Sequence, residues 1–149
     1  MNTDLAAILL VEDDPDDAFL VQRAIRKAGI ANPVLLAGDG DRAIEVLAAS
    51  IGEAGPIVEP PIGLVLLDLK MPRRSGFEVL TWLRERPVLA RIPVVVLTSS
   101  REPRDIDRAY DLGANSYLVK PGSPEELLAL VDQLGAYWLV VNEASETGR

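Results

Sequence analysis

Five short, mostly aliphatic runs that alternate with helix-patterned segments constrain the fold of this chain more than any other feature. The runs occupy residues 7–11, 34–37, 64–67, 94–97 and 116–119. The segments with helical spacing occupy residues 16–28, 39–49, 76–85, 103–112 and 124 to about 141. Continuous aliphatic runs are typical of parallel strands that helices cover on both faces. The alternation predicts an α/β fold: a doubly wound, flavodoxin-like parallel sheet of five strands in the order 2-1-3-4-5, with five helices.

The length of the chain allows one hydrophobic core. With 149 residues, 48% of them hydrophobic, we expect one domain over residues 1–149, with its core at about 7–141 and a flexible polar tail at 142–149. The Gly- and Pro-rich segment 51–62 is interpreted as a loop. No apolar stretch of about 18 residues and no basic-then-apolar N-terminus occurs, so we expect no membrane span, no signal peptide and a cytoplasmic location.

Composition excludes several kinds of chemistry. The chain has no cysteine and no histidine, which excludes disulfides, thiolate or imidazole zinc sites and Ser-His-Asp catalysis. A formal net charge of −8 disfavours nucleic-acid binding, which depends on cationic side chains. Carboxylates, hydroxyls and lysines remain, and this inventory favours hard cations and phosphoryl groups.

Acidic side chains follow two of the predicted strands. Glu12 and Asp13 come directly after the first strand, and Asp68 follows the third. Ligands of such sheets bind beyond the carboxyl ends of the strands, where the strand order reverses, so these carboxylates are expected to converge. Because they repel one another unless a cation neutralises them, we predict a Mg²⁺ site. The neighbouring acids are assigned to capping the first helix and to its dipole: Asp14, Asp16 and Asp17.

Two further strand ends supply a hydroxyl and an ammonium. Thr98 follows the fourth strand, and Lys120, before Pro121, follows the fifth. At the same edge of the sheet they would donate to a transferring phosphoryl group. A lysine taken alone is usually an ordinary surface residue, and the strand-end position is what argues otherwise here.

At these four places the sequence resembles response-regulator receiver domains, the CheY-like family. The resemblance covers roughly residues 8–138, and four motifs carry it: ILLVEDD at 8–14, LLDLKMP at 66–72, VVLTS at 95–99 and GANSYLVKP at 113–121. It implies that Asp68 is the phosphoacceptor, that Asp13 binds the metal directly and Glu12 through a water, and that Asp68 and the backbone carbonyl of Lys70 complete the protein ligands.

The same resemblance assigns the switch residues. Thr98 is similar to the hydroxyl that moves toward the phosphoryl group, Lys120 to the family's lysine and Tyr117 to its aromatic rotamer switch. The bond between Lys120 and Pro121 is a candidate cis peptide, which would aim the lysine inward. Asp68 is then expected to attack a phosphohistidine of a partner kinase in line, giving an acyl phosphate that is later hydrolysed by water.

A narrower resemblance points to a partner. LLDLKMP, IPVVVLTS at 92–99, YDLGANSY at 110–117 and YWL at 137–139 resemble single-domain regulators that accompany bacterial phytochrome histidine kinases. Without an output domain, the signal is expected to pass by contact. The last helix is too apolar for one buried stripe, so Tyr137, Trp138 and Val141 either cover the core or form a homodimer face.

The residues of the site also distinguish a receiver from a phosphatase and from a flavodoxin. Phosphatases of the haloacid-dehalogenase type have a second aspartate two residues after the nucleophile. This chain has Lys70 at that position, so it does not match their pattern. A flavodoxin would need a phosphate-binding loop after the first strand, where this chain has acids. A phosphate sink for a kinase and a binding scaffold that is never phosphorylated are the remaining alternatives.

Overall fold

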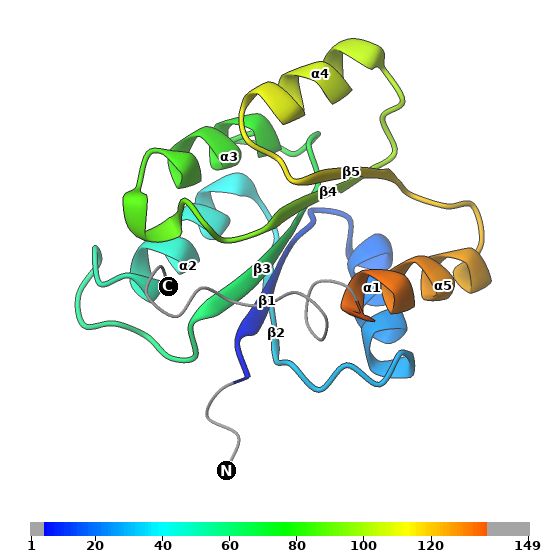
Figure 1. Cartoon of the computed structure of the whole chain (residues 1–149), viewed down its shortest axis with the longest axis horizontal. Coiled ribbons are helices and arrows are strands. Elements are labelled where there is room, and N and C mark those ends of the chain that lie inside the picture. Colours follow the sequence, from blue (N-terminus) through cyan, green and yellow to red (C-terminus); the bar gives the residue numbers. More distant parts are fainter. Residues whose placement is uncertain (1–4, 137–149) are drawn as a thin grey trace.

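The computed structural model describes residues 5–136, and within it five parallel strands form one sheet. The sheet order is β2-β1-β3-β4-β5, so the predicted fold class and strand order are confirmed (Figure 1). The strand bounds are β1 (Ala7–Val11), β2 (Val34–Ala37), β3 (Ile62–Leu67), β4 (Val94–Thr98) and β5 (Ser116–Val119). Each register is parallel, for example Leu10 opposite both Leu36 and Leu66.

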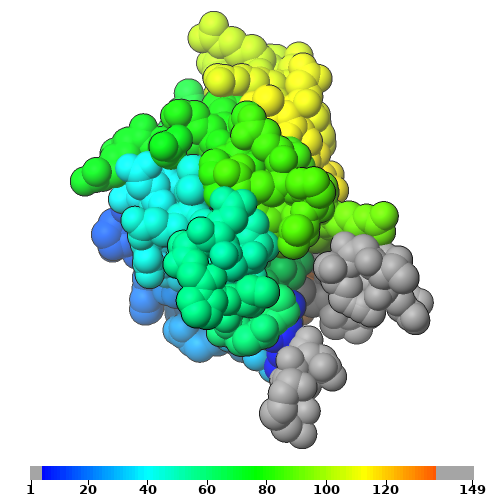
Figure 2. All heavy atoms as spheres, turned by 90° about the vertical axis from the view of Figure 1, so that its left-hand side faces the viewer, coloured from blue at the N-terminus to red at the C-terminus, as the bar shows by residue number. Residues whose placement is uncertain are grey.

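Helices cover both faces of this sheet. Their bounds are α1 (Pro15–Lys27), α2 (Gly40–Ser50), α3 (Gly76–Arg84), α4 (Pro103–Asp111) and α5 (Pro124–Gly135), with a short 3₁₀ helix, η1 (Pro87–Leu89), after α3. The core residues divide into a cluster under α1 and α5 and a cluster under α2, α3 and α4. Figure 2 shows α2 and α3 side by side across the second face, with α4 above them.

Strand residues alternate between the two clusters. In β1, Ile8 and Leu10 pack under α1 and α5, whereas Leu9 packs under α2 and α3. All five residues of β1 are buried, which explains why the strand is continuously aliphatic in sequence. The sheet therefore holds the carboxyl ends of β1, β3, β4 and β5 rigidly at one edge.

Helix caps follow the sequence signals. The Asp14 side chain accepts hydrogen bonds from the backbone N–H groups of Asp16 and Asp17, so its predicted capping role is confirmed. Ser75 and Glu78 form a reciprocal capping box at the start of α3, which fixes the end of the loop that follows β3.

The boundaries differ from the predictions in small ways. β3 begins at Ile62, within the segment predicted as a loop, and β4 includes Thr98. Tyr137, Trp138 and Val141, the end of the predicted last helix and the predicted tail at 142–149 lie outside the described residues. Within residues 5–136, no helix has the length and apolarity needed to cross a membrane.

The Arg84 side chain ties α3 to the far end of the sheet. Its guanidinium donates to the Gly113 carbonyl at 2.8 and 3.1 Å and to Asn115 Oδ1 at 2.9 Å. It also donates to the carbonyls of Ala90 at 3.0 Å and Ile92 at 2.9 Å. Burial lowers the pKa of Arg84. One side chain thus joins α3, the loop after η1 and the loop before β5.

Candidate functional site

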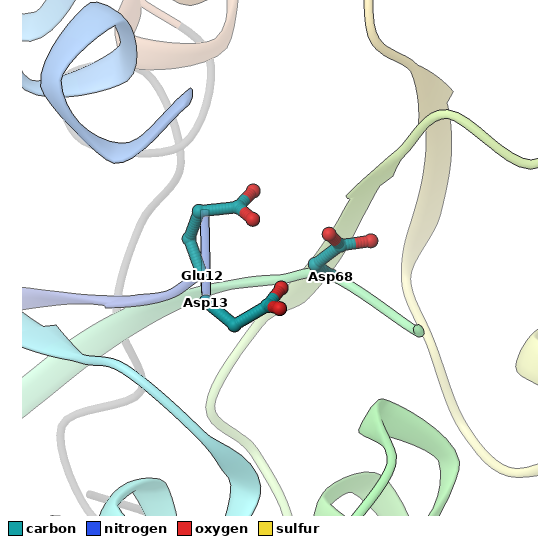
Figure 3. Close-up of side chains that lie close together, drawn as sticks. All are labelled: Glu12, Asp13 and Asp68. Atoms are coloured by element: carbon teal, nitrogen blue, oxygen red, sulfur yellow. The ribbon is translucent and has the colours of Figure 1, made fainter. Parts of the chain in front are cut away.

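Three carboxylates meet at the ends of β1 and β3. The backbone N–H of Glu12 donates to the Ala37 carbonyl at 3.0 Å and that of Asp68 donates to the Val11 carbonyl at 3.1 Å, so the sheet ladder holds both residues in place. A carboxylate oxygen from each of Glu12, Asp13 and Asp68 lies within 4.8 Å of the others. Figure 3 shows Glu12 and Asp13 side by side, with Asp68 facing them from the next strand. The predicted convergence is confirmed.

The Lys120 ammonium lies among these acids. Its Nζ atom is 2.7 Å from Glu12 Oε1, 3.2 Å from Asp68 Oδ2 and 2.9 Å from Asp17 Oδ2. The Lys120 side chain is 15% exposed, so it is held within the site rather than in solvent. Sequence reasoning does not predict the contact with Asp17, because it assigns that residue only to the dipole of the first helix. The sequence feature that could have predicted this contact is the position of Asp17 in the first turn of α1, directly after the acidic end of β1.

The predicted cis peptide between Lys120 and Pro121 is wrong. In the described part of the chain the cis bond is Glu59–Pro60. The backbone N–H of Lys120 donates to the Thr98 carbonyl at 2.8 Å, which extends the pairing of β5 with β4 by one residue. This pairing already directs Lys120 to the acidic edge, so the favoured trans bond is compatible with an inward lysine.

Burial and neighbouring charges shift the pKa values of Glu12 and Lys120. Burial raises the pKa of Glu12 to about 7, although hydrogen bonds from Lys120 and from the Asp14 N–H oppose this shift. Burial acts to lower the pKa of Lys120, but its hydrogen bonds with Glu12 and Asp17 outweigh burial and raise it. Three clustered carboxylates and one ammonium leave an excess of negative charge, and oxygen-only donors fit a divalent cation of the Mg²⁺ or Mn²⁺ kind.

Thr98 and Tyr117 are joined through Ser100. Thr98 is fully buried at the end of β4, and its Oγ1 accepts from the Ser100 N–H at 3.4 Å. The Tyr117 hydroxyl donates to the Ser100 carbonyl at 3.0 Å, while the ring packs partly buried against the core. Because the Thr98 hydroxyl accepts from the backbone in this contact, its own proton remains free to be donated to another group.

Comparison with known proteins decides the family. The model of the response regulator receiver domain matches residues 8–132. The chain belongs to the response regulator receiver family. It is 39% identical over 137 residues to the probable methanogenesis regulatory protein FilR2 of Methanothrix harundinacea, covering 92% of this chain and 86% of FilR2. It is 38% identical over 132 residues to the response regulator Rcp1 of Synechocystis, covering 89% and 88%.

Solved structures agree with this receiver assignment. The phosphorylated cyanobacterial phytochrome response regulator RcpA matches with a TM-score of 0.82 and 33% identity, covering 93% of this chain and 96% of RcpA. The Mn²⁺-bound form of Rcp1 matches with a TM-score of 0.79 and 34% identity, covering 94% and 99%. The predicted resemblance to phytochrome-associated receivers is therefore confirmed.

The receiver's Lys70 forms an ion pair with Asp105 in the first turn of α4. Its side chain is 66% exposed, and Nζ lies 3.4 Å from Asp105 Oδ2. Asp105 is itself buried, and the Ser100 hydroxyl donates to the same oxygen at 2.6 Å. The hydrogen bond from Ser100, with a smaller contribution from the charge of Lys70, lowers the pKa of Asp105. Sequence reasoning missed both Asp105 and Ser100, because neither stands directly at a strand end.

Gly76 lets α3 begin close to Asp68. A Cβ atom at this position would clash with the Asp68 carbonyl oxygen and lie 2.8 Å from Leu69 Cα. The Gly76 N–H also donates to the Leu69 carbonyl at 2.9 Å. Only a residue without a side chain fits this approach, which holds the loop after Asp68 close to the helix.

Proposed function

We propose that Asp68 is the phosphoacceptor of this receiver and takes a phosphoryl group from a phosphohistidine of a sensor histidine kinase. One observation carries the proposal: a buried carboxylate at the end of β3 faces the acids Glu12 and Asp13 and lies 3.2 Å from the Lys120 ammonium. The Lys120 ammonium offsets part of the negative charge of this acidic cluster, and an aspartate carboxylate can act as a nucleophile toward phosphorus.

We propose Mg²⁺ as the cofactor. Asp13 and Asp68 would bind the ion directly, Glu12 through a water, and the backbone carbonyl of Lys70 would be the remaining protein ligand. The ion would neutralise the phosphoryl oxygens during transfer. The buried, clustered carboxylates of this chain and the Mn²⁺-bound form of its relative Rcp1 support this choice.

The proposed transfer step uses the side chains gathered at this edge of the sheet. One Asp68 oxygen attacks phosphorus, the bond from phosphorus to the kinase histidine breaks, and the histidine leaves with the bonding electron pair. Lys120 stabilises the negative charge on the transferred group, and the Thr98 hydroxyl donates its proton in a hydrogen bond to a phosphoryl oxygen. Movement of Thr98 would break its contact with Ser100 and let Tyr117 pack deeper. The protein catalyses only this transfer and the later hydrolysis.

The proposed input is a bacteriophytochrome kinase. The relatives RcpA and Rcp1 support this partner, since RcpA is a phytochrome response regulator with 33% identity. A homodimer through Tyr137, Trp138 and Val141 and a cytoplasmic location stay predictions. A phosphate sink and an unphosphorylated scaffold remain competing roles. Lys70 in place of a second aspartate argues against a haloacid-dehalogenase-type phosphatase.

Phosphotransfer profiling tests the proposal. Purified histidine kinases, including a bacteriophytochrome, are labelled with ATP and mixed with the receiver in Mg²⁺, and transfer is followed over time. We expect one kinase to transfer its label at least about tenfold faster than the others, a preference of about 1.4 kcal/mol. If the phytochrome kinase transfers no faster than unrelated kinases, that partner is wrong. If no kinase and no small phosphodonor labels the chain, the phosphoacceptor role is wrong.

A further inference from the structure

We propose that Asp17 is a positioning residue that holds the Lys120 ammonium on the α1 side of the acceptor and thereby keeps an Asp68 oxygen free to take up a phosphoryl group. The contact between the two side chains, 2.9 Å from Lys120 Nζ to Asp17 Oδ2, carries the inference. This role rests on the proposed phosphoacceptor role of Asp68. The helix dipole explains an acid in the first turn of α1 but not its contact with a largely buried lysine.

Lys120 shares its ammonium among three carboxylates. Its Nζ atom lies 2.7 Å from Glu12 Oε1 and 2.9 Å from Asp17 Oδ2, but 3.2 Å from Asp68 Oδ2. Hydrogen bonds between an ammonium and a carboxylate are usually about 2.7–2.9 Å long, so the contact with the acceptor is the loosest of the three. Glu12 follows β1 and Asp17 lies in α1, so the two shorter contacts draw the ammonium toward the same side.

The lysine faces the Asp68 oxygen that the backbone leaves open. Asp68 Oδ1 accepts a hydrogen bond from the Leu69 N–H at 2.7 Å, whereas Oδ2 is the oxygen in contact with Lys120. Oδ2 is therefore better placed to attack phosphorus, and an ammonium pressed against it would occupy a lone pair that can make the attack. Without Asp17, the ammonium loses one of its two closer partners and is free to pair tightly with Oδ2.

The first turn of α1 holds Asp17 beside this lysine. The Asp14 side chain caps the helix by accepting from the Asp17 N–H at 3.3 Å, and the buried face of α1 fixes the helix against the sheet. The Asp17 side chain is 39% exposed, so its carboxylate reaches the edge of the site from outside the core. The neighbouring Asp16 is exposed and carries the same charge on the same turn, but Asp17 is the acid of this turn that contacts Lys120.

Uptake of a phosphoryl group requires the ammonium to exchange one contact for another. In transfer from acetyl phosphate, an Asp68 oxygen bonds to phosphorus, the bond from phosphorus to the acetyl oxygen breaks, and acetate leaves with the bonding electron pair. Lys120 then contacts a phosphoryl oxygen in place of Asp68 Oδ2. An ammonium anchored on Asp17 gives up only its loosest contact in this exchange, whereas an ammonium paired tightly with Oδ2 must first break a strong one.

The initial rate of phosphoryl uptake tests this role. Wild type, Asp17→Asn, Asp17→Glu and Asp16→Asn are mixed with acetyl phosphate in excess Mg²⁺, and the labelled fraction is followed by phosphate-affinity electrophoresis. Because the contact is partly exposed, we expect Asp17→Asn to lower the rate moderately, about fivefold, which is equivalent to about 1 kcal/mol. Asp17→Glu should recover most of the rate, and the matched control Asp16→Asn should keep it. A wild-type rate in Asp17→Asn, or an equal loss in Asp16→Asn, overturns the role of Asp17.

Unfolding in EDTA tests the contact without any phosphorylation. Urea titrations of wild type, Asp17→Asn, Lys120→Met and the double variant give four free energies of unfolding. Asp17→Asn should destabilise wild type but not Lys120→Met, because its effect passes through the lysine. Equal destabilisation in both backgrounds overturns the positioning role. If wild type takes up no phosphoryl group, the proposed function fails, whereas an unfolding cycle without coupling strikes only the role of Asp17.

Discussion

Replacing Lys120 with methionine should destabilise the metal-free protein and increase its response to Mg²⁺. The ammonium contacts Glu12, Asp17 and Asp68 within 3.2 Å, so its loss leaves their charges uncompensated. Removing one partner of a buried ion pair costs about 3–5 kcal/mol. Because Asp17 is 39% exposed and Glu12 can take up a proton, we expect about 2–3 kcal/mol here, which lowers the Tm by roughly 5–10 °C.

Magnesium separates this effect from ordinary loss of packing. The proposed Mg²⁺ ion would bind the carboxylates that Lys120 neutralises, so the variant should gain more Tm from millimolar Mg²⁺ than wild type does. Circular dichroism melts in EDTA and in MgCl₂ measure both quantities. Lys27→Met, at the exposed end of α1, is the matched control and should change the Tm little. Equal Mg²⁺ responses in Lys120→Met and wild type would refute the reasoning.

Three further perturbations address other parts of the structure. In metal-free buffer, wild type should lose stability as the pH rises from about 4.5 to 7, because the pKa of Glu12 is raised in the folded protein. Glu12→Gln lacks this group, so its stability should rise relative to that of wild type over the same window. A difference in unfolding free energy that does not change with pH in urea titrations contradicts this. Arg84→Ala should lose about 2–4 kcal/mol of stability, because the Gly113 carbonyl and the other acceptors of the Arg84 guanidinium lose their donor. Arg84→Lys should recover only part of this stability. An unchanged urea midpoint in Arg84→Ala contradicts a stabilising role for these hydrogen bonds. Gly76→Ala should displace the loop after Asp68 and slow phosphorylation more than it lowers the Tm, and an unchanged labelling rate contradicts this.

The fold was predictable because the strands are buried on both faces. A strand such as Ala7–Val11 must be aliphatic throughout, and this pattern is distinct from the spacing of the helices. The convergence of Asp13 and Asp68 followed from the geometry of parallel sheets, in which carboxyl ends share one edge. The 3₁₀ helix at Pro87–Leu89 was not predicted, since three residues carry no periodicity.

Contacts between loops and helices could not be read from the chain. Asp17 and Asp105 both lie in first turns of helices, where an acid is explained by the helix dipole alone. Their pairing with Lys120 and Lys70 depends on how those helices lie against the strand ends, which only the packed structure defines. The wrong cis peptide after Lys120 has the same origin, because the orientation of that lysine is set by pairing of β5 with β4.

Phosphorylation of Asp68 is the claim on which the other inferences depend. Wild type, Asp68→Asn and the exposed control Asp111→Asn are incubated with acetyl phosphate and Mg²⁺, and their intact masses are measured at neutral pH. We predict one added phosphoryl group on wild type and on Asp111→Asn, and none on Asp68→Asn. A labelled Asp68→Asn variant, or an unlabelled wild type, would contradict the account.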